Sequence, residues 1–284
     1  MTESAPVVLR SAANPTVRHL VRLRDNRYRR KSGRVIVDGW RETAQAIESG
    51  MTICGYYVSE SDADTVPANE DPAAARVRKH PAAAGKRMLA SDAIMEKIGY
   101  GDSVRGVVAE FERPDWGLGR LKLPASPLVL VLDKIEKPGN IGAVFRCADA
   151  AGIDAVLLSE CQDRFNPNAI RNSLGAIFRV PNASGSQQQI ADFLAAEDFR
   201  VLAARVESST PFWSVPWAGR VAVVLGSEAD GLGDRWQTIP GGDGKPQKID
   251  GVRIPMAGKV DSLNISVSAA VITFEAIRQR AHRT

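Results

Sequence analysis

The stretch LVLVLDKIEKPGNIGAVFRCADAAGIDAVLL, residues 128–158, determines how this chain folds. It opens with the apolar run Leu128 to Leu132 and closes with a second run, Ala155 to Leu158. Uninterrupted apolar runs of this length are typical of strands buried on both faces of a parallel sheet. Between the runs, apolar residues recur with helical spacing at Ile141, Val144, Phe145 and Ala148. The stretch therefore predicts strand, helix, strand.

Two further apolar runs continue this pattern toward the C-terminus. Val201 to Ala204 and Val221 to Leu225 each predict another buried strand, with helical segments between them. Strands that alternate with helices favour a mostly parallel sheet covered by helices on both faces. We therefore predict an α/β domain over residues 127–284.

The N-terminal part of the chain predicts a second, smaller α/β domain over residues 1–113, joined by a linker over residues 114–126. The linker carries Pro and Gly punctuation without a clear period. Residues 60–85 are rich in Ala, Pro, Asp and Glu and predict a loop excursion. The elements expected around it are strands at 35–37, 53–58 and 104–111 and helices at 40–49 and 91–98.

The charge of the chain is unevenly distributed. Residues 1–34 hold nine basic residues against two acidic ones, or +7, whereas the whole chain of 284 residues carries +4, which leaves −3 for the remainder. A basic segment, here residues 10–34, on a mildly acidic body is typical of polyanion binding. A solvated basic helix is the alternative explanation.

Composition argues against several other classes of protein. The sequence has no apolar run of about 18 residues, so no transmembrane helix is expected. Residues 1–9 lack the features of a signal peptide. Three cysteines form no C-x-x-C pair, and three histidines are too few for a His-rich metal site. We expect a cytoplasmic protein without a metal site.

The last predicted helix, from Ser262 to about Arg280, is apolar on two sides. One stripe contains Leu263, Val267, Ala270, Val271 and Phe274. The other contains Ile265, Ala269, Ile272 and Ala276. A helix with two apolar sides is usually buried on both. Its own sheet can cover one stripe, and a second subunit is the simplest cover for the other, so a homodimer is expected with either stripe outward.

Three motifs lie at junctions between strands and loops in the C-terminal domain. KPGNIGAVFR, residues 137–146, places Arg146 opposite the packed face of its helix. VLGSEADGL, residues 224–232, is a strand and a glycine turn with one carboxylate, and it matches neither a dinucleotide fingerprint nor a Walker loop. IPMAGKVDSLN, residues 254–264, brings Ser262 to a position that can cap the last helix. Taken singly, each motif is an ordinary turn or helix start.

Taken together and in this order, the motifs resemble those of the SpoU/TrmH branch of the SPOUT methyltransferases. The family patterns N-x-G-x-x-x-R, L-G-x-E-x-x-G-L and I-P-M-x-G-x-x-x-S-L-N are matched at every fixed position. Residues 14–39 and 106–109 are similar to an L30e-like substrate-binding domain. Residues 241–251 lengthen the chain between the second and third motifs, and we expect them to form a surface insertion.

This resemblance implies a SPOUT-type catalytic domain with a trefoil knot that holds S-adenosylmethionine. The cofactor-binding positions would be Gly226, Ile254, Met256 and Leu263. The catalytic group would be Arg146, framed by Asn140, Glu228, Ser262 and Asn264. Arg146 could act as the base, or as a charged group that positions phosphate and alkoxide, since free guanidinium is essentially always protonated. No metal is expected.

The implied reaction is 2'-O-methylation of ribose in RNA, with ribosomal RNA of the large subunit as the expected substrate. The basic side chains expected to contact RNA are Arg18, Arg22, Arg27, Arg30 and Arg171. Two alternatives stay open at this point. One is the same reaction on transfer RNA, and the other is a non-catalytic RNA-binding or ribosome-assembly protein with the same fold.

Overall fold

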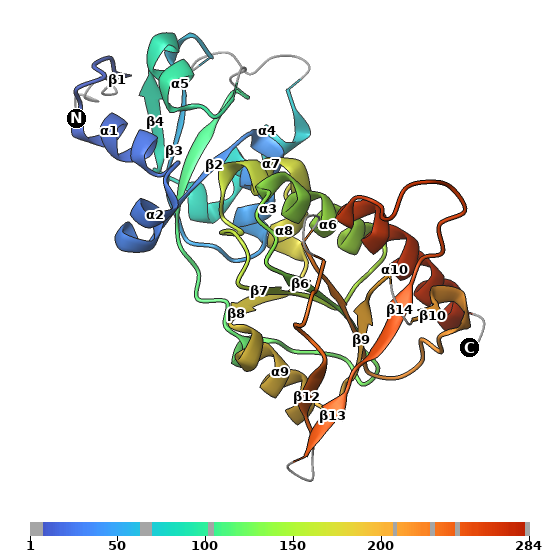
Figure 1. Cartoon of the computed structure of the whole chain (residues 1–284). Helices are drawn as coiled ribbons and strands as arrows, with labels where there is room; N and C mark the ends of the chain where they lie inside the picture. Colours follow the sequence, from blue (N-terminus) through green and yellow to red (C-terminus); the bar gives the residue numbers. More distant parts are fainter. Residues whose placement is uncertain are drawn as a thin grey trace. The chain divides into compact units, whose positions relative to one another are not determined.

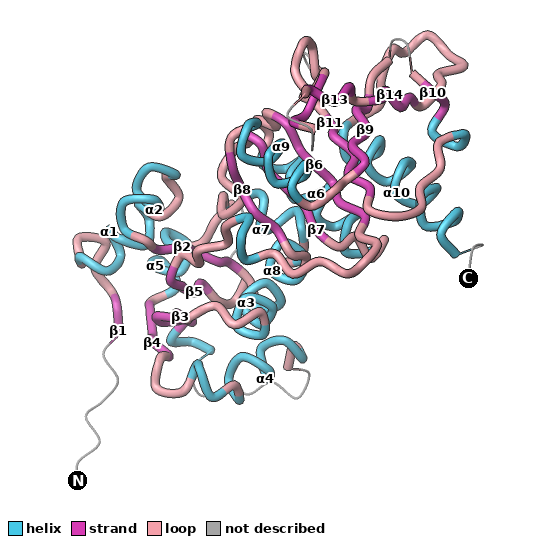
Figure 2. Tube along the Cα trace, turned by 90° about the horizontal axis from the view of Figure 1, so that it is seen from below, coloured by secondary structure: helices cyan, strands magenta, loops and turns pink. Residues whose placement is uncertain are grey.

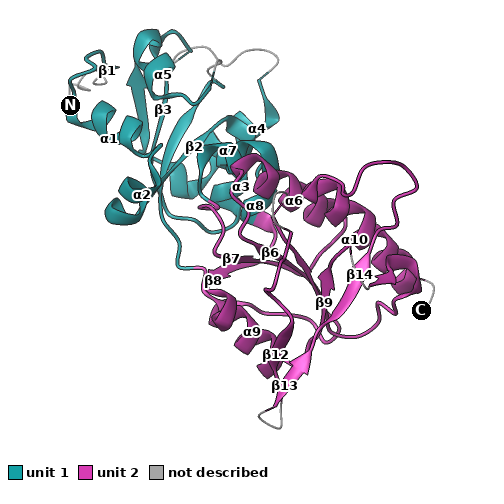
Figure 3. Cartoon of the chain, in the orientation of Figure 1, with its two compact units in different colours: residues 1–115, 165–178 teal, residues 116–164, 179–284 magenta. Residues whose placement is uncertain are grey.

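The computed structural model describes residues 8–62, 70–101, 105–206, 209–227, 231–241 and 245–281. The chain divides into two compact units (Figure 3). The first contains Met1–Asp115 together with Phe165–Phe178, and the second contains Trp116–Arg164 and Arg179–Thr284. The sequence placed residues 165–178 in the C-terminal domain, but they pack with the first unit.

The first unit is built on a five-stranded mixed sheet. In spatial order its strands are β1 (Val8–Leu9), β4 (Arg87–Ala90), β3 (Ile53–Ser59), β5 (Val108–Glu112) and β2 (Arg34–Asp38). β4 pairs in parallel with both β1 and β3, whereas β5 runs antiparallel to β3 and β2. The expected strands at 35–37 and 53–58 are therefore present, and the strand expected at 104–111 begins only at Val108 in the described residues.

Helices cover this sheet and build its core. They are α1 (Pro15–Arg22), α2 (Asn26–Ser32), α3 (Trp40–Glu48), α4 (Pro72–Lys79) and α5 (Asp92–Ile98). Val17 and Leu20 of α1 pack with Ile94 and Met95 of α5 in one apolar cluster. The helical spacing of these residues puts them on the inner faces of their helices, where their burial stabilises the unit.

The prediction of a loop over residues 60–85 is wrong for α4. Asp71 caps this helix by accepting a hydrogen bond from the backbone N–H of Ala73, and Pro72 occupies the first helical position. Both features favour a helix start. Ala73, Ala74 and Val77 form its buried face, and such small residues give only a weak amphipathic pattern in the sequence. Residues 63–69 of the predicted loop lie outside the described residues.

Two short helices, α7 (Pro167–Ser173) and α8 (Ala176–Arg179), follow each other in the chain. α7 packs against β2 and so completes the first unit. The Arg171 Nη1 atom donates a hydrogen bond to the backbone carbonyl of Tyr100. Gly175 has φ +82° and lies against the buried Gln45 side chain of α3, where a β-carbon would come within 1.9 Å of Oε1. Only glycine fits this backbone conformation at this distance.

The second unit contains a seven-stranded sheet in which every neighbouring pair is parallel, as the apolar runs predicted. Figure 2 shows its strands in magenta. In spatial order its strands are β10 (Thr210–Pro211), β14 (Asp250–Arg253), β9 (Arg200–Ala204), β11 (Val221–Leu225), β6 (Leu128–Asp133), β7 (Ala155–Ser159) and β8 (Asn182–Gly185). The mixed α/β architecture expected from the sequence is thus confirmed. The trefoil knot stays a prediction.

Three helices cover the two faces of this sheet. They are α6 (Pro138–Ala150), α9 (Gln187–Ala196) and α10 (Ile265–Ala281). Figure 1 shows α6 and α10 on the opposite side of the sheet from α9. Val129, Val131 and Val224 point to the α9 side, where they form a core with Ile190 and Leu194. Leu118, Leu121 and Leu123 of the predicted linker also pack against this core.

The two stripes of α10 differ in burial. Ile265, Ala269, Ile272 and Ala276 are buried within the unit. Val267 and Phe274 of the other stripe are 46% and 52% exposed. The stripe that remains for a partner is therefore the one that begins with Leu263. Ile272 is only 1% exposed, so a charge placed there would disrupt the protein's own core.

The predicted surface insertion at residues 241–251 is correct only in part. β12 (Thr238–Pro240) and β13 (Pro246–Lys248) form an antiparallel pair, and β13 is exposed. Asp250 and Gly251, however, belong to β14 of the main sheet.

Short 3-10 helices lie at Glu60–Asp62, Pro81–Ala83, Leu118–Arg120 and Phe212–Ser214. Among the described residues, no helix has the length and apolar character needed to cross a membrane.

The contact at Gly175 can be tested with a double-mutant cycle. We expect Gly175→Ala to lower the free energy of unfolding by about 1 kcal/mol more than Gly85→Ala, because both positions have positive φ but only Gly175 faces a buried side chain. Urea denaturation measures the difference. In a Gln45→Ala background the extra cost should disappear. An equal cost for both glycines in the parent protein would contradict the close approach of Gly175 to the Gln45 side chain.

Candidate active site

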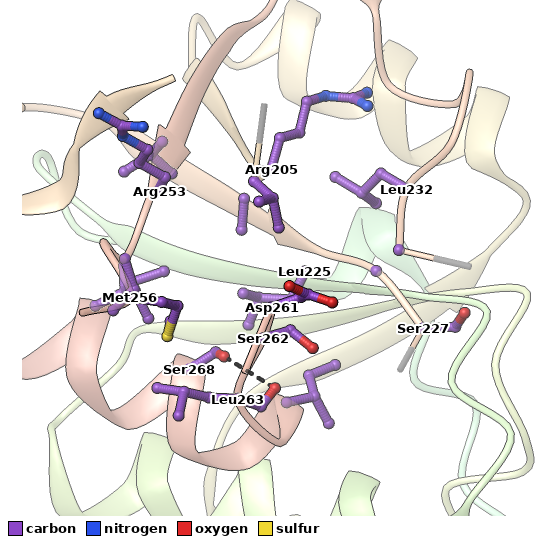
Figure 4. A pocket seen from close by; sticks show the side chains of 18 of the residues that line it. Arg205, Leu225, Ser227, Leu232, Arg253, Met256, Asp261, Ser262, Leu263 and Ser268 are labelled. Carbon is purple, nitrogen blue, oxygen red and sulfur yellow. Dashed lines mark hydrogen bonds between the residues drawn. The ribbon is translucent and has the colours of Figure 1, made fainter. Parts of the chain in front are cut away.

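The carboxyl ends of β9, β11 and β14 lead into a common cavity in the second unit. Because parallel strands point the same way, the loops after them meet at one edge, which is where α/β sheets bind ligands. The cavity has a volume of about 360 Å³, within the range of small-molecule sites. Its lining comes from residues 204–206, 225–227, 231–233, 252–254 and 261–263, with Met256, Ile265, Ser268 and Ile272 completing the wall. Figure 4 shows labelled side chains from each of these loops around the cavity, among them Arg205, Leu225 and Leu263.

The four residues expected to bind the cofactor line this cavity together. They are Gly226, Ile254, Met256 and Leu263. The second and third motifs are far apart in the sequence, but β11 and β14 are separated in the sheet by β9 alone. The strand order thus brings the loops that follow β11 and β14 to the same place.

Gly226 is held against the backbone of the chain that follows it. A β-carbon at this position would lie 2.2 Å from the carbonyl oxygen of Gly231 and 2.7 Å from the nitrogen of Leu232. Ser227 and Gly231 also exchange two backbone hydrogen bonds, of 3.1 and 3.0 Å. No side chain fits between these two segments, so glycine is required here for a close approach of backbone to backbone.

The start of α10 differs from the predicted one. The helix begins at Ile265, and Asn264 takes the capping role: its Oδ1 accepts hydrogen bonds from the Ser266 N–H (2.9 Å) and Oγ (2.6 Å). Ser262 was expected to cap this helix, but it is exposed and lines the cavity instead. Both serine and asparagine are good capping residues, and the structure selects the one directly before the helix.

The first and third motifs meet where α6 packs against α10. The Asn264 Nδ2 atom lies 3.5 Å from Oδ1 of Asn140, in the first turn of α6. Farther along α6, the Cys147 thiol lies 3.6 Å from the backbone carbonyl of Ser266 in α10. Burial raises the pKa of this thiol, which keeps it protonated as a donor at neutral pH. The two asparagines are thus fixed beside each other by the helix pair.

Arg146 is exposed on α6, as its position opposite the packed face predicted. Within the described residues its guanidinium forms no hydrogen bond or ion pair, and it lines neither of the two cavities. The side chain is therefore held only by its helix. Glu228, the remaining residue expected in the catalytic frame, lies outside the described residues.

A second cavity, of about 380 Å³, lies between the loop after β6 and the turn after β11. Its walls include Asn140 and the charged side chains Asp133, Lys134, Glu136, Lys137, Asp234 and Arg235. Ser227, Gly231, Leu232 and Gly233 line this cavity as well as the first. The two cavities are therefore neighbours that share one wall of backbone.

Four of the five arginines expected to contact RNA lie together at the start of the first unit. Arg18 and Arg22 are exposed on α1, and Arg27 and Arg30 are exposed on α2. The Arg22 guanidinium lies over the Tyr28 ring at 4.0 Å, which orders one end of the group. Arg171 differs from these four, because it is partly buried and donates to the Tyr100 carbonyl.

The motifs did not point to several polar residues around the cavities. Arg205 directly follows β9, Asp133 is the last residue of β6, and Arg235 lies beyond the second motif. Arg205 and Asp133 could have been identified from the sequence, since a charged residue at the carboxyl end of a buried parallel strand is a candidate site residue. Arg235 lies in an irregular turn, and its sequence gives no comparable signal.

The sequence profile of the SpoU rRNA Methylase family matches residues 127–274, and that of the MRM3-like substrate binding domain matches residues 14–109. The chain belongs to the SpoU rRNA methylase family. The matched region is 30% identical to the 23S rRNA (guanosine(2553)-2'-O)-methyltransferase RlmP of Bacillus subtilis and covers 54% of this chain and 59% of that protein. It thus spans less than two thirds of the length of this relative.

Further relatives share more of the chain. The 23S rRNA (guanosine-2'-O-)-methyltransferase RlmB of Haemophilus ducreyi is 31% identical over 66% of this chain and 77% of its own. A solved RNA 2'-O ribose methyltransferase superposes with a TM-score of 0.79 at 32% identity, covering 97% of this chain and 100% of that one. AviRb from Streptomyces viridochromogenes, solved with AdoMet, gives 0.82 at 22% identity over 94% and 98% of the two chains. AviRb therefore shares the fold.

The backbone contact at Gly226 makes a prediction about stability. We expect Gly226→Ala to lower the free energy of unfolding by about 2 kcal/mol, because the methyl group overlaps backbone that cannot rotate away. Gly258→Ala is the control, since that glycine of the third motif has open space around it. Urea denaturation of both variants measures the difference. If the two variants were equally stable, the close approach would be disproved.

Proposed function

We propose that this protein transfers a methyl group from S-adenosylmethionine to a ribose 2'-hydroxyl of RNA, in ribosomal RNA of the large subunit. One observation carries the proposal: Gly226, Ile254, Met256 and Leu263 line a single cavity beside the contact between Asn140 and Asn264. Family membership and the printed names of RlmP and RlmB support the same reaction.

The first cavity has the chemistry that an adenosyl cofactor needs. Leu225, Ile254 and Leu263 offer apolar surface for a flat base, and Gly226 leaves peptide groups without a covering side chain. Asp261 adds a carboxylate at the rim. Sites for small molecules typically combine an apolar lining with a few polar groups in this way. When bound, S-adenosylmethionine supplies a methyl group on positively charged sulfur.

The second cavity is the proposed place of the acceptor nucleotide. It shares a wall with the first cavity, so a ribose held there lies next to the methyl donor. Asn140 lines it and touches Asn264, which gives paired amide groups for the ribose hydroxyls. Holding two reactants in line can supply several kcal/mol of the barrier to transfer.

The 2'-hydroxyl must release its proton, here to solvent water, as its oxygen accepts the methyl group and the bond from that methyl group to sulfur breaks, and we assign Arg146 to this oxygen. Its guanidinium is exposed and free of intramolecular partners within the described residues, so it is available to RNA. Guanidinium stays protonated in proteins. The proposed role is therefore to bind the phosphate at the target nucleotide and to stabilise the developing alkoxide.

Substrate binding is proposed for the basic face of α1 and α2. Arg18, Arg22, Arg27 and Arg30 are exposed there and can neutralise RNA phosphates. The match of residues 14–109 to a substrate-binding domain supports this assignment. We place the reaction in the cytoplasm, in keeping with three cysteines that are free thiols in the structure.

The catalytic assignment predicts a loss of turnover without a loss of stability. We expect Arg146→Ala to reduce methyl transfer at least about 100-fold, as removal of an electrostatic donor does, and to change unfolding by about 0.5 kcal/mol or less because the side chain is exposed. The assay follows labelled methyl from S-adenosylmethionine into 23S rRNA and maps the modified ribose. Arg146→Lys keeps the charge and should retain part of the rate.

Other outcomes of this assay would point elsewhere. Wild-type turnover by Arg146→Ala would remove Arg146 from the reaction. RNA binding by the parent protein without any methyl transfer would favour the non-catalytic assembly protein. Transfer to tRNA but not to ribosomal RNA would keep the chemistry and change the substrate.

A homodimer through α10 is the second part of the proposal. Val267 and Phe274 are half exposed on one face of this helix. Trp213, 53% exposed, continues the patch, since Gln279 of α10 donates a hydrogen bond to its carbonyl. Exposed apolar surface of this kind is typical of protein contacts. A second copy of the chain would cover it and hold the start of α10, where Asn264 lies.

This dimer predicts a specific effect of charge on the outward stripe. We expect Val267→Asp combined with Phe274→Asp to dissociate the dimer and lower activity, because each copy would have to bury two unpaired carboxylates in the interface. Light scattering at several protein concentrations gives the mass. The folded state of the variant is checked by circular dichroism. A parent protein that is monomeric and fully active at micromolar concentration would refute the dimer.

A further inference from the structure

The turn from Gly231 to Trp236 forms the wall between the two cavities. Gly231, Leu232 and Gly233 line both of them, and Arg235 lines the second. Its shape therefore sets the width of the first cavity and the distance between the two. What holds this turn in place bears directly on the binding of both reactants.

The backbone of the turn is strained. Trp236 has φ +56°, a conformation that a bulky side chain rarely adopts. Such residues cost about 1–3 kcal/mol each and persist only where the surroundings fix them. Apolar packing holds part of the turn, since Leu232 and Trp236 are buried in the core on the α9 side of the sheet. The polar groups of the turn need separate anchors.

Arg235 is one such anchor. Its Nε and Nη2 atoms donate to the two oxygens of Asp133, at 2.7 and 2.9 Å, and Nη2 also lies 3.2 Å from Glu160. The Asp133 side chain is 1% exposed and accepts a further hydrogen bond of 2.6 Å from Ser159. Burial alone would raise the pKa of Asp133, but the hydrogen bonds from Arg235 and Ser159 outweigh it and lower the pKa. The carboxylate is thus charged and fully paired.

Arg205 is the other anchor. From the end of β9, its Nη1 atom donates to the carbonyl of Gly233 at 2.7 Å, and its Nη2 atom donates to the carbonyls of Arg235 and, at 3.2 Å, Trp236. Figure 4 shows its side chain extending away from the middle of the cavity. The second half of the turn is therefore held twice, by Arg205 through its backbone carbonyls and by Arg235 through its own side chain.

We propose that Arg235 is a positioning residue for cofactor binding, whose two hydrogen bonds to Asp133 hold the turn Gly231–Trp236 as the common wall of the two cavities. This inference rests on the proposed function. Asp133 ends β6 and begins the loop to α6, which carries Asn140 and Arg146. The same ion pair thus joins the cofactor wall to the loop that serves the acceptor. The geometry needs a planar fork, which lysine cannot supply.

The test compares Arg235→Lys with Arg220→Lys by isothermal titration of the whole protein with S-adenosylmethionine. Arg220 precedes β11 and pairs with Glu197, 48% exposed, at 2.7 Å; it lines neither cavity, so its replacement controls for the loss of a paired arginine that does not hold the wall. We expect Arg235→Lys to weaken cofactor binding about tenfold or more, the loss of one charged hydrogen bond. Arg220→Lys should bind like the parent. Thermal unfolding without cofactor should shift more in Arg235→Lys than in Arg220→Lys, because Asp133 is buried whereas Glu197 is half exposed.

Kinetics supply the readout that a merely structural role would not give. We expect the KM for S-adenosylmethionine to rise in Arg235→Lys while kcat at saturating cofactor changes little. Asp133→Asn, which keeps the shape of its side chain, should show the same split and serves if Arg235→Lys fails to fold. Unchanged cofactor affinity in both variants would overturn the proposal. Cofactor binding by the parent without RNA methylation would overturn only the proposed function.

Discussion

The contact between the backbone of Gly226 and that of Gly231 and Leu232 is the constraint on which the site depends. At this point two segments of the chain touch without any side chain between them. The chain leaving β11 can therefore fold back closely enough to form a thin wall, with a cavity on each side. A thicker wall would separate the two reactants of a group transfer, and transfer in line requires them to be adjacent.

The apolar runs of the sequence predicted the fold of the second unit well, for a clear physical reason. A strand buried on both faces of a parallel sheet must be apolar throughout, so β6, β7, β9 and β11 are visible as uninterrupted runs. α4 was missed because alanine and proline carry little periodic signal. The docking of α7 in the first unit was missed because packing between segments far apart in the sequence leaves no local pattern.

The site was predictable to the extent that its residues lie in motifs at the ends of strands. Gly226 lines the first cavity and Asn264 contacts Asn140 of the second, while their roles in cofactor binding and catalysis stay predictions; Asn264 and not Ser262 caps α10. Which of the two suitable residues caps the helix depends on the residue at which the helix begins. The sequence predicts that position only to within a few residues, so it does not decide between Ser262 and Asn264. Asp133 and Arg235 were missed as a pair, because an ion pair across 102 residues depends on the neighbouring positions of β6 and β11 and on the path of the turn after β11, neither of which leaves a local pattern.

The path of the chain links the two units more closely than a single linker would. After β7 the chain leaves the second unit, packs as α7 in the first, and returns to the second unit before β8. Pro167, Ala169 and Ile170 are buried there, so removing residues 1–113 would expose this apolar face of α7. The first unit thus packs against a segment whose two ends continue into β7 and β8 of the second unit's sheet. The RNA surface proposed on α1 and α2 therefore belongs to a body that also includes residues 165–178, and deletion of residues 1–113 would remove the packing partner of α7 together with that surface.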